Sequence, residues 1–192
     1  MNYLWVFGYG SLMWRPGFPY VEARPARMLG VHRALCVYSW VHRGTPERPG
    51  LVLGLDRGGT CRGMAFRVAP EDREEVVAYL RAREQVTGVY LEQVRDVRFE
   101  DGGTAPALTY VVDRAHEQYA GKLDVHDQLR IVAQAQGQSG RNAEYVINTA
   151  LHLAAIGVPD RLLSALAERL GAEEHLDADQ AASETAGPGA RS

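Results

Sequence analysis

A strand-like run near the start of the chain ends in two glycines and a serine, in the order Phe7-Gly8-Tyr9-Gly10-Ser11-Leu12-Met13-Trp14. The run superficially suggests a dinucleotide-binding fingerprint, but Met13 stands at the third glycine position and the following Arg15-Pro16-Gly17 predicts no helix. The Gly-Lys-Ser/Thr of a phosphate-binding loop is also missing. Two interpretations remain: a turn that presents successive backbone N–H groups to an anion, or an ordinary tight turn out of a buried strand.

A second candidate is Glu84, at the end of the first predicted helix. Val76, Val77 and Leu80 precede it at helical spacing, so the four side chains share one face of that helix. Burial and the negative end of the helix dipole both raise the pKa of such a carboxyl. A raised pKa suits a group that takes and returns a proton near neutral pH. The alternative is an exposed glutamate that pairs with Arg81 or Arg83.

Two polar segments supply further candidates for binding. The segment Ser39–Glu47 predicts a loop between two strands, in which Arg43 is placed to grip a carboxylate in bidentate fashion. In Ser139–Tyr145, Asn142 or Ser139 is expected to cap a helix whose first turn carries Tyr145. The alternatives are an ordinary surface loop around Arg43 and a merely packed Tyr145.

Other kinds of site are poorly supported. The six histidines are scattered and form no His-Glu-x-x-His, so we expect no metal. The dense run Asp124–Asp127 indicates an acidic helix N-terminus. Cys36 and Cys61 lie in apolar strand-like runs, where buried, inert thiols are the rule. Ser11 lacks the Gly-x-Ser-x-Gly elbow of a serine nucleophile.

Strands dominate the first part of the chain and helices its last third, which predicts an α+β fold. The predicted strands are Tyr3–Phe7, Glu22–Leu29, Arg33–Tyr38, Leu51–Leu55, Gly63–Val68, Gln93–Phe99 and Ala107–Val112. The predicted helices are Pro70–Glu84, Asp124–Gln136, Asn142–Ile156 and Pro159–Leu170.

The composition of the chain limits the classes of partner and the number of domains that we expect. The 192 residues carry 21 basic and 24 acidic side chains, a net charge of −3, which argues against a nucleic-acid partner. Neither a signal peptide nor a transmembrane run is evident, so we expect no membrane partner and a cytoplasmic protein with reduced thiols. We expect one domain over residues 1–171. Residues 172–192, with five acidic residues and many alanines, are predicted to be a disordered tail.

Taken together, the motifs resemble the ChaC family of γ-glutamylcyclotransferases. The matching segments cover about residues 3–170 and are FGYGSLMWRPGF at 7–18, HRGTPERPG at 42–50, GGTCRGMAFRV at 58–68, YLRAREQVTGVY at 79–90 and SGRNAEYVINTALHLAAIGVPD at 139–160. The resemblance implies a small mixed β-barrel flanked by α-helices.

The resemblance also implies an activity, a lyase-type cleavage of an amide C–N bond by cyclisation. Glutathione is the expected substrate, and 5-oxoproline and cysteinylglycine are the expected products. By resemblance Glu84 is the acid/base residue, the turn of Tyr9, Gly10, Ser11, Leu12, Met13 and Trp14 binds the γ-glutamyl group, and Tyr145 closes the pocket. The substrate's own α-amine is the nucleophile, so no metal or cofactor is required.

Two alternatives remain open at this point. A γ-glutamylamine cyclotransferase would use the same fold and carboxyl with a different leaving amine, and would differ in the loops around Arg43. A non-catalytic small-molecule-binding module would keep Glu84 only as a structural ion-pair partner.

Overall fold

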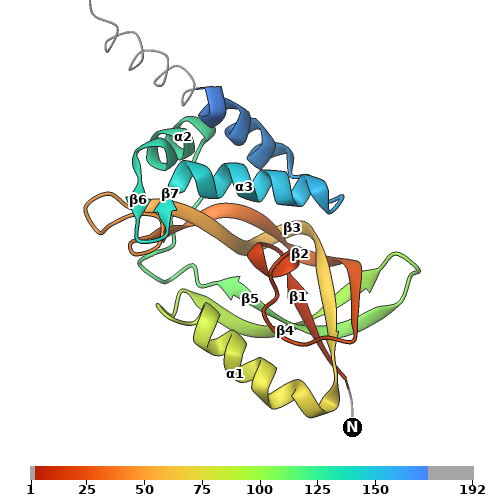
Figure 1. Ribbon diagram of the computed structural model, residues 1–192. Helices are drawn as coiled ribbons and strands as arrows, with labels where there is room; N and C mark the ends of the chain where they lie inside the picture. Colours follow the sequence, from red (N-terminus) through yellow and green to blue (C-terminus); the bar gives the residue numbers. More distant parts are fainter. Residues whose placement is uncertain (1–2, 173–192) are drawn as a thin grey trace, which may run out of the picture.

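The computed structural model describes residues 3–172, and its centre is a closed five-stranded barrel (Figure 1). The strands are β1 (Leu4–Gly8), β2 (Glu22–Ser39), β3 (Gly50–Val68), β4 (Tyr90–Phe99) and β5 (Thr104–Val112). Their order around the barrel is β1-β3-β2-β4-β5. All pairs are antiparallel except β1 with β5, whose parallel pairing closes the barrel. The predicted mixed β-barrel is therefore confirmed.

The central hairpin differs from the prediction, because β2 and β3 are each one long strand where the sequence predicted two. The predicted break after Leu29 is a register shift between Leu29 and Val31, around Gly30 with φ of +75°. In the second strand, Gly58 and Gly59 also have positive φ. Glycines in this conformation form bulges, which bend a strand without ending its pairing. The glycines that the sequence predicted as strand ends therefore mark bends within long strands.

Helices cover two sides of the barrel (Figure 1). On one side, a 3₁₀ turn over Pro70–Asp72 (η2) leads into α1 (Arg73–Glu84), whose Val76 and Leu80 are fully buried against the barrel. On the other side lie α2 (Val125–Gln134), α3 (Asn142–Ala155) and a helix over residues 161–172. A short two-stranded pair, β6 (Gln136–Gly137) and β7 (Gly140–Arg141), joins α2 to α3 and was not predicted.

The predicted helices are confirmed, with their boundaries shifted by at most three residues; the largest shift is at the start of α1, where Pro70–Asp72 form a 3₁₀ turn. Asp124 caps α2 by accepting a hydrogen bond from the backbone N–H of Asp127, so the acidic run does mark a helix N-terminus. The two predicted strands after α1 begin three residues earlier than expected, at Tyr90 and Thr104. Apart from Ala172, the predicted tail lies outside the described residues. Within residues 3–172, no helix is long and apolar enough to cross a membrane.

Candidate active site

A cavity of about 110 Å³ lies between the loop after β1, strand β3, the end of α1 and the first turn of α3. Six of the nine predicted site residues line it: Tyr9, Gly10, Ser11, Leu12, Glu84 and Tyr145. The remaining lining residues are Phe7, Val52, Leu53, Tyr90 and Tyr110. Segments far apart in the sequence therefore contribute one carboxyl group and four tyrosines to a single hollow.

Glu84 is both a buried carboxyl and an ion-pair partner, the two alternatives that the sequence left open. It is the last residue of α1, its side chain is only 18% exposed, and it lines the cavity. Arg83 Nε also lies 3.2 Å from its Oε1, whereas Arg81 pairs with Glu92 at 2.7 Å. Burial raises the pKa of the Glu84 carboxyl, and the Arg83 charge offsets part of that rise. The result is a buried carboxyl that binds a proton more readily than an exposed one.

This burial predicts a pH-dependent gain in stability from Glu84→Gln. A carboxyl whose pKa is raised on folding stabilises the fold only while it is protonated, and that contribution is lost as pH rises through the raised pKa. The variant should therefore melt at a higher temperature than the native protein near pH 7. The difference should vanish below the ordinary glutamate pKa, about 4.3. Thermal melts at both pH values measure it, and a variant that melts at or below the native temperature at pH 7 contradicts it.

The loop after β1 has free backbone donors. Here the sequence predicted no helix, but Ser11–Met13 form a single 3₁₀ turn (η1), closed by a hydrogen bond from Met13 N to Gly10 O at 2.9 Å. Within residues 3–172, the N–H groups of Gly10, Ser11 and Leu12 donate to no protein acceptor. Since these three residues line the cavity, the loop offers unpaired donors beside it, which suits an anionic group.

Arg83 connects this loop to α1. Its Nη2 donates to Ser11 Oγ at 2.9 Å, and its Nη1 donates to Arg15 O at 3.0 Å and to Tyr79 OH at 2.9 Å. The loop and the Glu84 carboxyl are thus fixed by one side chain. From the sequence, Arg83 was expected only as an ion-pair partner of Glu84.

Two tyrosines that the sequence did not single out, Tyr90 and Tyr110, complete the cavity wall. Tyr90 OH donates to Leu53 O at 2.7 Å, and Leu53 N donates to Tyr145 OH at 3.2 Å. The Tyr145 oxygen accepts that bond, so the hydroxyl hydrogen of Tyr145 is still available to donate to a ligand. Burial raises the pKa of Tyr9, Tyr90 and Tyr145, so these phenols stay neutral at physiological pH.

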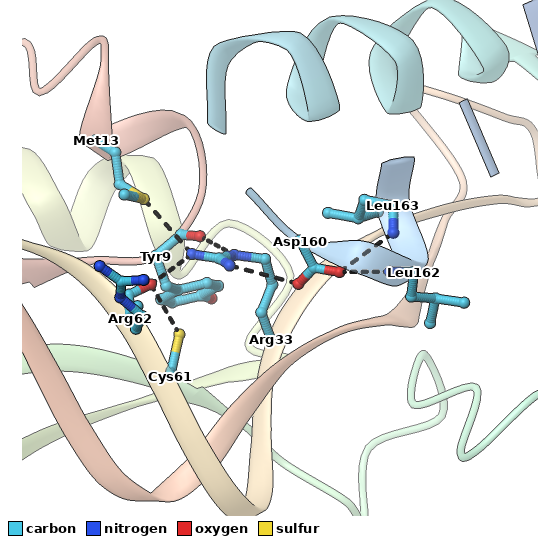
Figure 2. Close-up of polar contacts among 8 residues, drawn as sticks. All are labelled: Tyr9, Met13, Arg33, Cys61, Arg62, Asp160, Leu162 and Leu163. Atoms are coloured by element: carbon cyan, nitrogen blue, oxygen red, sulfur yellow. Dashed lines mark hydrogen bonds and ion pairs between the residues drawn. The ribbon is translucent and has the colours of Figure 1, made fainter. Parts of the chain in front are cut away.

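The other three predicted residues lie outside the cavity lining. Met13 is buried, with Sδ 3.6 Å from an Arg33 nitrogen (Figure 2). Trp14 stacks on His152 of α3, with ring centroids 4.7 Å apart. Arg43 lies over the ring of the lining residue Tyr145: its Cζ is 5.4 Å from the ring centroid, and its Nη1 donates to Arg141 O at 3.2 Å.

The prediction that Asn142 or Ser139 caps α3 was wrong. Arg141 is the N-cap and makes no side-chain capping bond, while Ser139 Oγ lies 3.0 Å from His42 Nδ1. Asn142 is instead fully buried, where Oδ1 accepts from Leu51 N at 2.7 Å and Nδ2 donates to Leu51 O at 2.8 Å. Asn142 therefore pairs with a strand instead of capping the helix. Its carboxamide has one acceptor and one donor group, which match the N–H and the C=O of Leu51.

The cysteines are buried as predicted. Burial raises the pKa of the Cys36 thiol to about 12 and that of Cys61 to about 11, so neither forms a thiolate readily. In the part of the chain that the structure describes, no cluster of three or more histidine, cysteine or acidic side chains has the arrangement to hold a metal ion.

Comparison with known proteins gives consistent results. A family model described as ChaC-like protein matches residues 4–173. A glutathione-specific γ-glutamylcyclotransferase of Escherichia coli K12 is 34% identical over 157 residues, which are 82% of this chain and 68% of that protein. Gamma-glutamylcyclotransferase 2-3 of Arabidopsis thaliana is 31% identical over 191 residues, covering 93% of this chain and 96% of its own.

The fold also matches a solved structure. A crystal structure of a selenomethionine-labelled γ-glutamyl cyclotransferase specific to glutathione from yeast superposes with a TM-score of 0.79. The match covers 89% of this chain and 96% of the yeast chain, at 24% sequence identity. At this identity the superposition establishes a shared fold.

Proposed function

Since this chain belongs to the ChaC-like family, we propose that it is a glutathione-specific γ-glutamylcyclotransferase that releases 5-oxoproline and cysteinylglycine. The relatives from Escherichia coli, mouse and human are named for this glutathione-specific activity, at 33–34% identity. The observation that carries the proposal is the shared cavity, in which the buried Glu84 carboxyl lies together with the unpaired N–H groups of residues 10–12.

The reaction needs one proton carrier and no enzyme nucleophile. The substrate α-amine is an ammonium at neutral pH, and Glu84 takes its proton. The free amine then attacks the γ-carbonyl carbon, forming the C–N bond of a five-membered lactam. When the amide C–N bond breaks, Glu84 returns that proton to the departing nitrogen, which becomes the α-amine of cysteinylglycine. The ring nitrogen still carries two hydrogens, and it loses one to the Glu84 carboxylate, which passes it to the product amine and is ready for the next cycle. A carboxyl whose pKa is raised by burial suits these transfers.

Holding the substrate folded is the second requirement, because amine and carbonyl carbon must approach to ~3–3.5 Å. We propose that the N–H groups of Gly10, Ser11 and Leu12 bind the α-carboxylate and that Tyr9 and Tyr145 enclose the glutamyl chain. In this account Met13 and Trp14 fix the turn without touching substrate. The cavity of about 110 Å³ is smaller than the ~300 Å³ or more of whole-ligand pockets. It therefore suits the glutamyl group, with cysteinylglycine lying outside.

A substrate panel tests this function. Purified protein should form 5-oxoproline from glutathione, and more slowly from a γ-glutamylamine such as ε-(γ-glutamyl)lysine. A preference for the γ-glutamylamine would replace the proposal with the alternative cyclotransferase. If the protein binds glutathione but converts neither compound, it is a binding module of this fold.

We predict that Arg43 contacts the glycine carboxylate of glutathione. The Arg43 guanidinium lies over the ring of Tyr145, which lines the cavity, although Arg43 itself is not a lining residue. Arg43→Lys keeps the charge but loses the planar fork, so it should lower kcat/KM for glutathione by about tenfold. The comparison substrate is γ-glutamylcysteine, which has no glycine and should be affected less. An equal loss for both substrates contradicts this role.

A further inference from the structure

A buried arginine that does not line the cavity, Arg33 of β2, holds the loop after β1 from behind (Figure 2). Only 5% of its side chain is exposed. Nε donates to Tyr9 O at 2.5 Å, Nη2 donates to Arg62 O at 2.7 Å, and Nη1 lies 3.5 Å from Asp160 Oδ2. The two carbonyl contacts are the short ones, so the guanidinium is fitted mainly to the backbone and only secondarily to its ion-pair partner.

The contact with Tyr9 O determines where the next backbone donor points. In a trans peptide the C=O of one residue and the N–H of the following residue point in opposite directions. The Tyr9 carbonyl is directed at Arg33, so the Gly10 N–H is directed away from Arg33. Gly10 lines the cavity and its N–H has no protein acceptor within residues 3–172. Fixing the carbonyl therefore fixes a free donor on the cavity side of the same peptide.

Asp160 holds Arg33 from the other side. Its Oδ1 accepts hydrogen bonds from Leu162 N at 3.1 Å and Leu163 N at 3.2 Å, which caps the helix over residues 161–172. Its Oδ2 faces the guanidinium (Figure 2). The carboxylate thus neutralises a charge that is almost fully buried, and it ties the last helix to the loop.

We propose that Arg33 is a positioning residue for substrate binding: it orients the Tyr9–Gly10 peptide so that the Gly10 N–H binds the substrate α-carboxylate. This inference rests on the proposed function. A purely structural Arg33, serving only the ion pair with Asp160, would instead affect stability and leave ligand discrimination unchanged. The two roles differ in whether the loss depends on the α-carboxylate of the ligand.

Equilibrium binding to protein carrying Glu84→Gln, in which turnover is expected to be ~10²–10⁴-fold slower, tests the proposal. The two probes are glutathione and its analogue in which hydrogen replaces the α-carboxylate. Adding Arg33→Met should raise Kd for glutathione at least about tenfold, since hydrogen bonds to a charged group are strong, and should change Kd for the analogue less than about twofold. Arg33→Lys keeps the buried charge beside Asp160 but cannot hold both carbonyls, so its effect on glutathione should be intermediate.

The matched control is Arg27→Met, which changes an exposed arginine of the same strand and should leave both Kd values unchanged. Thermal melts identify a variant that does not fold. If Arg33→Met does not fold, the same two Kd values are compared for Arg33→Lys. Equal weakening of both ligands, or none, overturns the positioning role. Protein with Arg33 intact that binds neither ligand overturns the proposed function, and this inference falls with it.

Discussion

Replacing Glu84 with glutamine is expected to reduce kcat for glutathione by ~10²–10⁴-fold, the usual cost of removing a general acid/base. Glutamine has nearly the same shape but does not accept and return a proton. The fold should persist, because Val76 and Leu80 anchor the same face of α1 in the buried core. Arg83 also keeps its hydrogen bonds to Ser11 and Tyr79, so the loop after β1 stays in place.

The matched control is Glu75→Gln, which makes the same chemical change at an exposed position of the same helix. It should leave kcat and KM within about twofold of the native values, since exposed substitutions change little. Steady-state measurement of 5-oxoproline release compares both variants. If Glu84→Gln keeps activity within a few-fold of the native protein, Glu84 is not the proton carrier.

The second large effect is expected on stability, from Asn142→Ala. The substitution leaves the N–H and C=O of Leu51 without partners in the interior and opens a small cavity. We expect a loss of about 2–4 kcal/mol, since each unpaired buried group costs roughly 1–3 kcal/mol. For a domain of this size that is a fall in melting temperature of roughly 4–16 °C. Tyr145, in the first turn of α3, should lose its fixed place as well.

Asn148→Ala is the control for this substitution, because Asn148 lies exposed on the same helix. Chemical denaturation should show it within about 0.5 kcal/mol of the native protein. An Asn142→Ala protein as stable as that control would show that the contact between α3 and β3 contributes little to the fold.

The helices and the buried Glu84 were predictable because local patterns determine them. Apolar residues at helical spacing, an acidic first turn and a carboxyl at the end of one face are all visible within α1. The loop after β1 was recognisable from its two glycines. Its 3₁₀ turn was not predicted, since three residues carry no periodicity.

Features that depend on distant partners were not predictable. Gly30, Gly58 and Gly59 looked like chain breaks, and only the opposite strand of the hairpin shows them to be bends. Tyr90 and Tyr110 have the pattern of ordinary strand residues, which does not distinguish a cavity wall from a core. Asparagine is a residue type that commonly caps helices, but the partner of Asn142 is Leu51, which lies 91 residues earlier in the chain.

In the proposed reaction the substrate's own amine, and not water, attacks the γ-carbonyl. Incubating the protein with glutathione in ¹⁸O-labelled water, and analysing the products by mass spectrometry, distinguishes the two nucleophiles. We expect 5-oxoproline and cysteinylglycine in equal amounts, with no ¹⁸O in the 5-oxoproline formed by the enzyme. Formation of glutamate carrying ¹⁸O would show hydrolysis, and intact glutathione after incubation with folded protein would show no such activity. Either result contradicts attack by the substrate's own amine in this protein.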